Sequence, residues 1–135
     1  MRKRPAFFRG ARELLRKRIK LETELKRVPY KSKSSVLAQL IQVEKSSGKT
    51  PPQLKEYREC KVPEHFQYIM DYFYDCYTGE RYTHTEMLNW MEIKRIRLAA
   101  WEVDCLRVMW SEKDASDAAY QQRVIESTRT GKGKK

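Results

Sequence analysis

The sequence contains three cysteines and two histidines, the residue types that most often bind zinc, and these are Cys60, Cys76, Cys105, His65 and His84. A zinc site needs ligands in close pairs, and the sequence has neither Cys-x-x-Cys nor His-x-x-x-His. The cysteines are odd in number, widely spaced and set among apolar residues with helical spacing, which favours buried free thiols in a reducing cytoplasm. The sequence around His84 contains no motif that pairs a histidine with a carboxylate or a nucleophile for catalysis. We therefore expect no metal site and no catalytic residues.

The tripeptide Gly48-Lys49-Thr50 resembles the end of a phosphate-binding loop. That loop requires another glycine five residues before Gly48, where this chain has Val43. It also requires a helix directly after the threonine, where this chain has Pro51-Pro52. We therefore predict an ordinary loop here, no bound cofactor and a protein that is not an enzyme.

Basic residues are concentrated at the two ends of the chain. Residues 1–35 hold 13 Lys and Arg against 3 Glu, and residues 36–128 hold 12 against 15 acidic residues. Apolar residues recur at helical spacing between Pro5 and Val28, so we predict a basic amphipathic helix that ends before Pro29. Its candidate contacts for anions or nucleic acid are Arg9, Arg12, Arg16, Lys17, Lys20, Lys26 and Arg27.

Four roles remain open for this N-terminal helix. Its apolar stripe could pack on the rest of the protein and leave the basic residues in water. Its basic face could contact nucleic acid or another anionic surface, or the stripe could dock into a partner protein. An organellar transit peptide is the fourth alternative, although the helix contains acidic residues and few serines. No apolar stretch is long enough to span a membrane or to serve as a secretory signal.

The spacing of apolar and aromatic residues in the middle of the chain predicts a compact aromatic core within residues 62–112. The first apolar segment, from Val62 to Tyr77, has the clearest helical spacing in the sequence. Thr83 and Glu86 form a capping pattern, so the next helix should begin at His84 and end near Arg95. A third helix is expected from Ala99 to about Glu112. Three more predictions are a short helix over residues 35–46, an extended linker over 51–61 anchored by Leu54, and a flexible basic tail after Thr128.

Two short helices joined by a short turn raise the alternative of a helix-turn-helix motif. The second helix would then have to approach phosphates and base edges. It carries Glu102, Asp104 and Glu112, and the bulky Trp101 lies in its first turn. This composition favours two helices that pack their tryptophans into a core.

These elements predict an all-α protein in three parts: a basic N-terminal helical extension over residues 1–35, a helical domain over 36–128, and a basic tail over 129–135. Methionine and aromatic side chains adapt to varied apolar partners, but they line ordinary cores equally well. The residues that we predict to bind a partner protein are Tyr72, Met87, Trp90, Met91, Trp101 and Met109.

Residues 48–112 contain, in order, Gly48-Lys49-Thr50-Pro51-Pro52-x-Leu54, an aromatic helix, a Thr78-Gly79 loop, Tyr82-Thr83-His84-Thr85-Glu86 followed by Trp90, and Leu98-x-x-Trp101-Glu102-Val103-x-x-Leu106. In this pattern the chain resembles the small tail assembly chaperones of long-tailed bacteriophages, and in particular the downstream, frameshift-linked member of the chaperone pair. We would not expect so basic an N-terminal helix in such a chaperone, and this is where the chain departs from the pattern.

The resemblance implies a non-enzymatic protein that binds the tape-measure protein and tail-tube subunits during tail building. It also implies a location in the host cytoplasm and absence from the finished particle. The alternative is a small basic nucleic-acid-binding protein, or an accessory subunit of a nucleoprotein complex, that acts through residues 2–33 and the lysine-rich tail.

Overall fold

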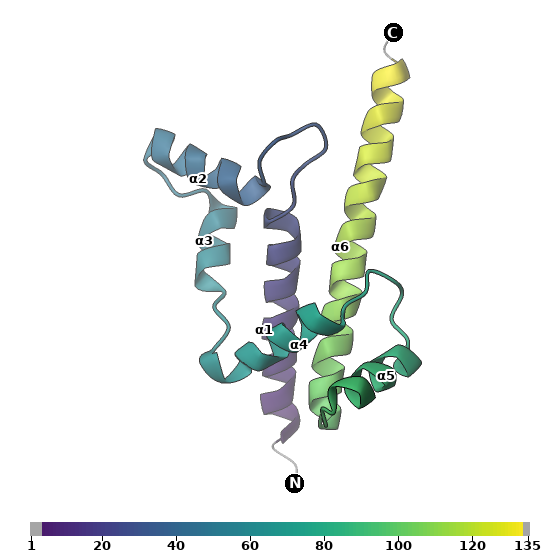
Figure 1. Ribbon diagram of the computed structural model, residues 1–135. Coiled ribbons are helices and arrows are strands. Elements are labelled where there is room, and N and C mark those ends of the chain that lie inside the picture. Colours follow the sequence, from purple (N-terminus) through teal and green to yellow (C-terminus); the bar gives the residue numbers. More distant parts are fainter. Residues whose placement is uncertain (1–3, 134–135) are drawn as a thin grey trace.

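The computed structural model describes residues 4–133, with side chains from residue 9 to residue 129. Every regular element in this range is helical, which confirms the predicted all-α fold (Figure 1). The elements are α1 (Arg4–Leu25), α2 (Val36–Ser47), α3 (Pro52–Glu59), a single 3₁₀ turn η1 (Glu64–Phe66), α4 (Gln67–Cys76), α5 (His84–Lys94) and α6 (Ala100–Gly133).

The two longest helices, α1 and α6, lie side by side and run in the same direction (Figure 1). Ala11, Leu15 and Ile19 recur at steps of four along α1 and are buried in the main core. Full burial of such a Leu or Ile contributes roughly 1.5–3 kcal/mol. The sequence left open whether the N-terminal helix packs on the body, and the structure shows that it does. The stripe residues Phe7 and Phe8 lie outside the described side chains.

The short helix α4 crosses α1 and α6 (Figure 1), and it contributes Phe73 to a core that also contains Phe66 of η1 and Trp110 of α6. Ile69, Met70 and Phe73 are buried at its inner face. Three tyrosines of the 68–77 segment donate hydrogen bonds from their hydroxyls to carboxylates of the long helices, namely Tyr68 to Glu102, Tyr74 to Glu22 and Tyr77 to Asp114. Tyr68 and Tyr74, which lie off the main stripe of α4, and Tyr77, which directly follows the helix, therefore tie α4 to both neighbours.

The predicted helix starts are confirmed at two caps. The hydroxyl of Ser35 accepts a hydrogen bond from the Ala38 amide at 3.1 Å, and α2 begins directly afterwards. The Thr83 hydroxyl accepts from the Glu86 amide at 3.1 Å, so α5 begins at His84 as predicted. Gly48 ends α2 with a φ of 76°, a left-handed conformation that glycine adopts without steric cost.

The predicted extended linker over residues 51–61 is wrong, because residues 52–59 form the helix α3. Pro52 is the first residue of this helix, where proline is well tolerated. Leu54 is the buried anchor that the sequence predicted. The Glu44 carboxylate of α2 accepts two hydrogen bonds from the Arg58 guanidinium, at 2.8 and 2.9 Å, and this contact links α2 to α3.

Several helix ends differ from the predicted ones. Helix α1 ends at Leu25, and Val28 lies outside it with half of its side chain exposed. The segment after Val62 starts with the 3₁₀ turn, so α4 begins only at Gln67. Helix α6 continues without a break to Gly133, so the predicted flexible tail is wrong up to that residue, and residues 134–135 lie outside the described range.

Candidate protein-binding surface

The six residues predicted to bind a partner divide into two groups in the structure. Met87 and Met109 are buried in the main core and have almost no accessible surface. The other four pack against that core and remain partly accessible, and they are Tyr72, Trp90, Met91 and Trp101. The structure thus does not gather all six on one surface.

Trp90 and Tyr72 form a polar and aromatic contact between α5 and α4. Their rings meet edge to face with centroids 5.5 Å apart, a favourable geometry for aromatic pairs. The Trp90 indole donates a hydrogen bond to the Asp75 carboxylate at 2.7 Å. This contact positions α5 on the body.

Helix α5 also presents apolar side chains that point away from the core. Leu88 is 62% exposed and Ile93 is 78% exposed, whereas Met87 on the same helix is buried. A cleft of about 810 Å³ lies at the end of this helix, and its lining residues are Leu88, Met91, Glu92, Ile93, Arg95, Ile96 and Arg97. We call this region the α5 cleft. Of these seven residues, the sequence predictions singled out only Met91.

The wall of the α5 cleft is fixed by the way α5 ends. The Arg95 amide donates to the Glu92 carbonyl at 3.2 Å, and the Ile96 amide donates to the Met91 carbonyl at 2.9 Å. This pair of hydrogen bonds is the Schellman motif. In this motif the apolar residue two positions after the end of the helix, here Ile96, commonly packs against the last helical turn. Arg95 occupies the left-handed position of the motif, with a φ of 56°. The sequence gives only a weak signal for this helix end, because glycine is the usual residue at the left-handed position.

The predicted anion contacts of α1 are largely paired with carboxylates. Arg16 contacts Glu13 at 2.6 Å and Glu112 of α6 at 3.1 Å. Four more members of the predicted set also form ion pairs, which are Arg12 with Glu13, Lys17 with Glu56, Lys26 with Glu22, and Arg27 with Asp117. Arg9 and Lys20 are exposed. The positive charge that dominates the N-terminal sequence is thus partly neutralised in the fold, and no finding supports the nucleic-acid alternative.

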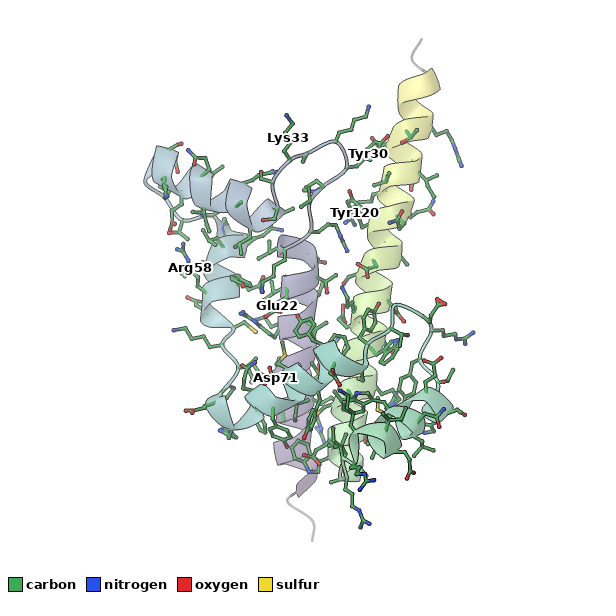
Figure 2. The ribbon with its side chains drawn as sticks, viewed as in Figure 1. Glu22, Tyr30, Lys33, Arg58, Asp71 and Tyr120 are labelled. Atoms are coloured by element: carbon green, nitrogen blue, oxygen red, sulfur yellow. The ribbon has the colours of Figure 1, made fainter. Side chains whose placement is uncertain are left out.

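Arg18, which interrupts the apolar stripe in the sequence, is the centre of a polar network between α1 and α3. It donates to the Glu22 carboxylate at 2.7 Å and to the Cys60 carbonyl at 3.0 Å. Its guanidinium lies 4.4 Å from the centre of the Tyr57 ring. Glu22 is only 8% exposed and also accepts from the Tyr74 hydroxyl, so its charge is well compensated (Figure 2). The spacing of residues in the sequence did not predict this network.

The loop between α1 and α2 is attached to the second half of α6. Arg27 donates to Asp117 at 2.7 Å and lies over the Tyr120 ring, 4.3 Å from its centre. The Tyr30 amide donates to the Tyr120 hydroxyl, and Figure 2 shows these two tyrosines facing each other. Arg27 therefore has an intramolecular role.

The three cysteines lie in surroundings that make their thiols unreactive. All three cysteines are free and buried, and burial raises the pKa of Cys76 to about 12 and that of Cys105 to about 11. Thiols with such a pKa stay protonated at neutral pH and are poor nucleophiles. Within residues 4–133 no group of three His, Cys, Asp or Glu residues is arranged to hold a metal ion. The same range contains no helix long and apolar enough to cross a membrane.

Comparison with known proteins identifies one family. The family model described as phage tail assembly chaperone matches residues 43–113, which is more than half of the chain. No curated protein and no solved structure matches. The matched region runs from the end of α2 through α5 into the first part of α6, so it contains the α5 cleft. The predicted resemblance is confirmed, and the chain belongs to the phage tail assembly chaperone family.

Proposed function

We propose that this protein binds the tape-measure protein, the tail-tube subunits or both while a phage tail is assembled. The family match over residues 43–113 carries this proposal. A second observation supports it: one helix inside the matched region exposes two large apolar side chains, Leu88 and Ile93. Exposed apolar side chains that gather at a cleft mark protein-binding sites more often than isolated ones do.

The proposed action is reversible shielding of apolar surface. A tail protein that has not yet assembled exposes apolar surface that would otherwise aggregate. A small protein can cover part of that surface without forming or breaking covalent bonds. We therefore propose a non-enzymatic role in the cytoplasm of the infected bacterium, with the protein absent from the finished particle.

Co-production in bacteria tests this proposal. The full-length chain would be produced with an affinity tag together with the tape-measure protein of the same phage, and in parallel with the tail-tube protein. We expect at least one of the two to be recovered with the tagged chain and to be more soluble than when it is produced alone. Recovery of neither protein would refute the proposal.

Salt separates this function from nucleic-acid binding. Binding to phosphates weakens by orders of magnitude between about 50 and 200 mM salt, whereas burial of apolar surface does not. Nuclease treatment and a wash at about 200 mM salt should therefore leave the tail protein bound. Loss of all captured protein after nuclease treatment would favour a nucleic-acid bridge and contradict direct binding.

A further inference from the structure

We infer that the α5 cleft binds an amphipathic segment of a tail protein that carries acidic side chains beside its apolar ones. The inference rests on the proposed function only for the identity of the protein that carries this segment. Three features of the cleft support it: exposed apolar residues, arginines without a carboxylate partner, and the left-handed backbone at Arg95.

The apolar contribution comes from Leu88 and Ile93, the two most exposed of the large apolar side chains in the described part of the chain. Met91 and Ile96 line the same cleft and are partly buried. A cleft of about 810 Å³ is within the range of sites that bury a bound apolar group. An apolar side chain of a partner can therefore leave water on entering it.

The charged contribution comes from Arg95 and Arg97. Neither guanidinium takes part in an ion pair within the part of the chain that the structure describes. The contrast is with α1, where the residues in ion pairs are Arg12, Arg16, Lys17 and Arg18. Lys94 beside them contacts Asp75 at 3.4 Å, and Glu92 is the one acidic residue in the lining. The cleft therefore has an excess of positive charge, which complements a partner segment with Asp or Glu beside its apolar residues.

The backbone at Arg95 supports a role for its side chain. This residue has a φ of 56°, a conformation that favours glycine, and the chain does use glycine at the corresponding position of α2, where Gly48 has a φ of 76°. An arginine at this position costs conformational energy that a glycine would not. Strain of this kind is found preferentially at binding sites, and here it places a guanidinium at the edge of an apolar cleft.

Two sets of variants test the inference on the full-length chain, with the tape-measure protein of the same phage as the probe. Leu88→Ser combined with Ile93→Ser removes the apolar contact. Val43→Ser combined with Ile125→Ser is the matched control, because these two apolar side chains are about half exposed and lie outside the cleft. We expect the first pair to weaken binding about tenfold or more and the control pair to have little effect.

Charge is tested separately. Arg95→Glu combined with Arg97→Glu should weaken binding at low salt and reduce its salt dependence. Arg95→Gly should weaken binding while unfolding at the same or a higher denaturant concentration than the wild type, because it relieves the left-handed strain. A variant that binds less and is no less stable cannot have lost binding through misfolding.

The outcomes distinguish the inference from the proposed function. If the wild type captures no tail protein, the proposed function fails. If the wild type captures the tape-measure protein and the cleft variants capture it equally well, only the inference fails. A concentration-dependent dimer of the wild type that Leu88→Ser with Ile93→Ser dissociates would assign the cleft to a second copy of this chain and would also overturn the inference.

Discussion

Truncation of Leu15 to alanine tests whether α1, which lies outside the matched family region, is an integral part of the fold. Leu15 is 0% exposed and belongs to the same buried cluster as Phe73 of α4 and Met109 of α6. Removing a fully buried leucine side chain leaves a cavity and costs about 2–5 kcal/mol. This is a large fraction of the roughly 5–15 kcal/mol by which a typical domain is stable.

The assay is urea unfolding followed by tryptophan fluorescence, because Trp110 is buried in the same cluster. With a denaturant slope of about 1.5 kcal/mol per M, a loss of about 3 kcal/mol lowers the unfolding midpoint by about 2 M. Leu88→Ala is the matched control, because the same atoms are removed from a side chain that is 62% exposed. We expect the control to change the free energy of unfolding by less than about 0.5 kcal/mol.

Equal effects of Leu15→Ala and Leu88→Ala would refute this reasoning. Such a result would mean that α1 is not packed on α4 and α6 in solution. The body of the protein would then have to be stable without the residues that α1 supplies to its core.

Three further predictions concern the polar contacts. Burial and then a hydrogen bond to a carboxylate raise the pKa of Tyr68, Tyr74 and Tyr77 above the ordinary value of 10.0. The contribution of these three tyrosines to the free energy of unfolding is therefore complete below pH 10 and is lost as the pH rises above it. Urea unfolding from pH 9 to 11 should show that Tyr74→Phe loses less free energy of unfolding over this range than the wild type does. Hydrogen bonds from Arg58 and Thr50 lower the pKa of Glu44 from 4.5 to about 2, so the contact between α2 and α3 is complete above pH 4.5 and weakens as the pH falls toward 2. After correction for the intrinsic exchange rate at each pH, the protection of amides in α2 and α3 should fall over that range in the wild type, and Glu44→Gln should show low protection already at pH 6. Arg27→Ala removes the contacts with Asp117 and Tyr120, so amide exchange should accelerate in residues 26–35, with a change of less than about 1 kcal/mol in global stability.

Local signals in the sequence predicted the parts of the fold that local interactions determine. The spacing of Ile69, Met70 and Phe73 predicted an inner helical face, and these residues are buried. The pattern of Thr83 and Glu86 predicted the start of α5, because a side-chain cap needs only the next three residues.

Features that depend on distant parts of the chain could not be predicted in this way. Helix α3 buries little besides Leu54 and contacts α2 through Arg58 and Glu44, so its own sequence has a weak apolar pattern. The pairing of Arg16 with Glu112 joins residues 96 positions apart, and only the packing of α1 on α6 brings them together. Charge density alone therefore overstated how much of the basic face is available to anions.

The candidate site shows the same limit. Helix α5 has apolar residues on more than one side, and periodicity does not indicate which side faces the core. The structure places Met87 inside and leaves Leu88 and Ile93 exposed. The sequence predictions named Met87, Trp90 and Met91 on this helix and did not include Leu88 and Ile93, which the structure leaves most exposed.

Recovery of tail proteins from infected cells tests the central claim most directly. The tagged full-length chain would be isolated from a nuclease-treated lysate during particle assembly and washed at about 200 mM salt, and the bound proteins would be identified by mass spectrometry. The account predicts that the tape-measure protein or the tail-tube protein is recovered in amounts comparable to the chain. Recovery of the chain without either protein would contradict it.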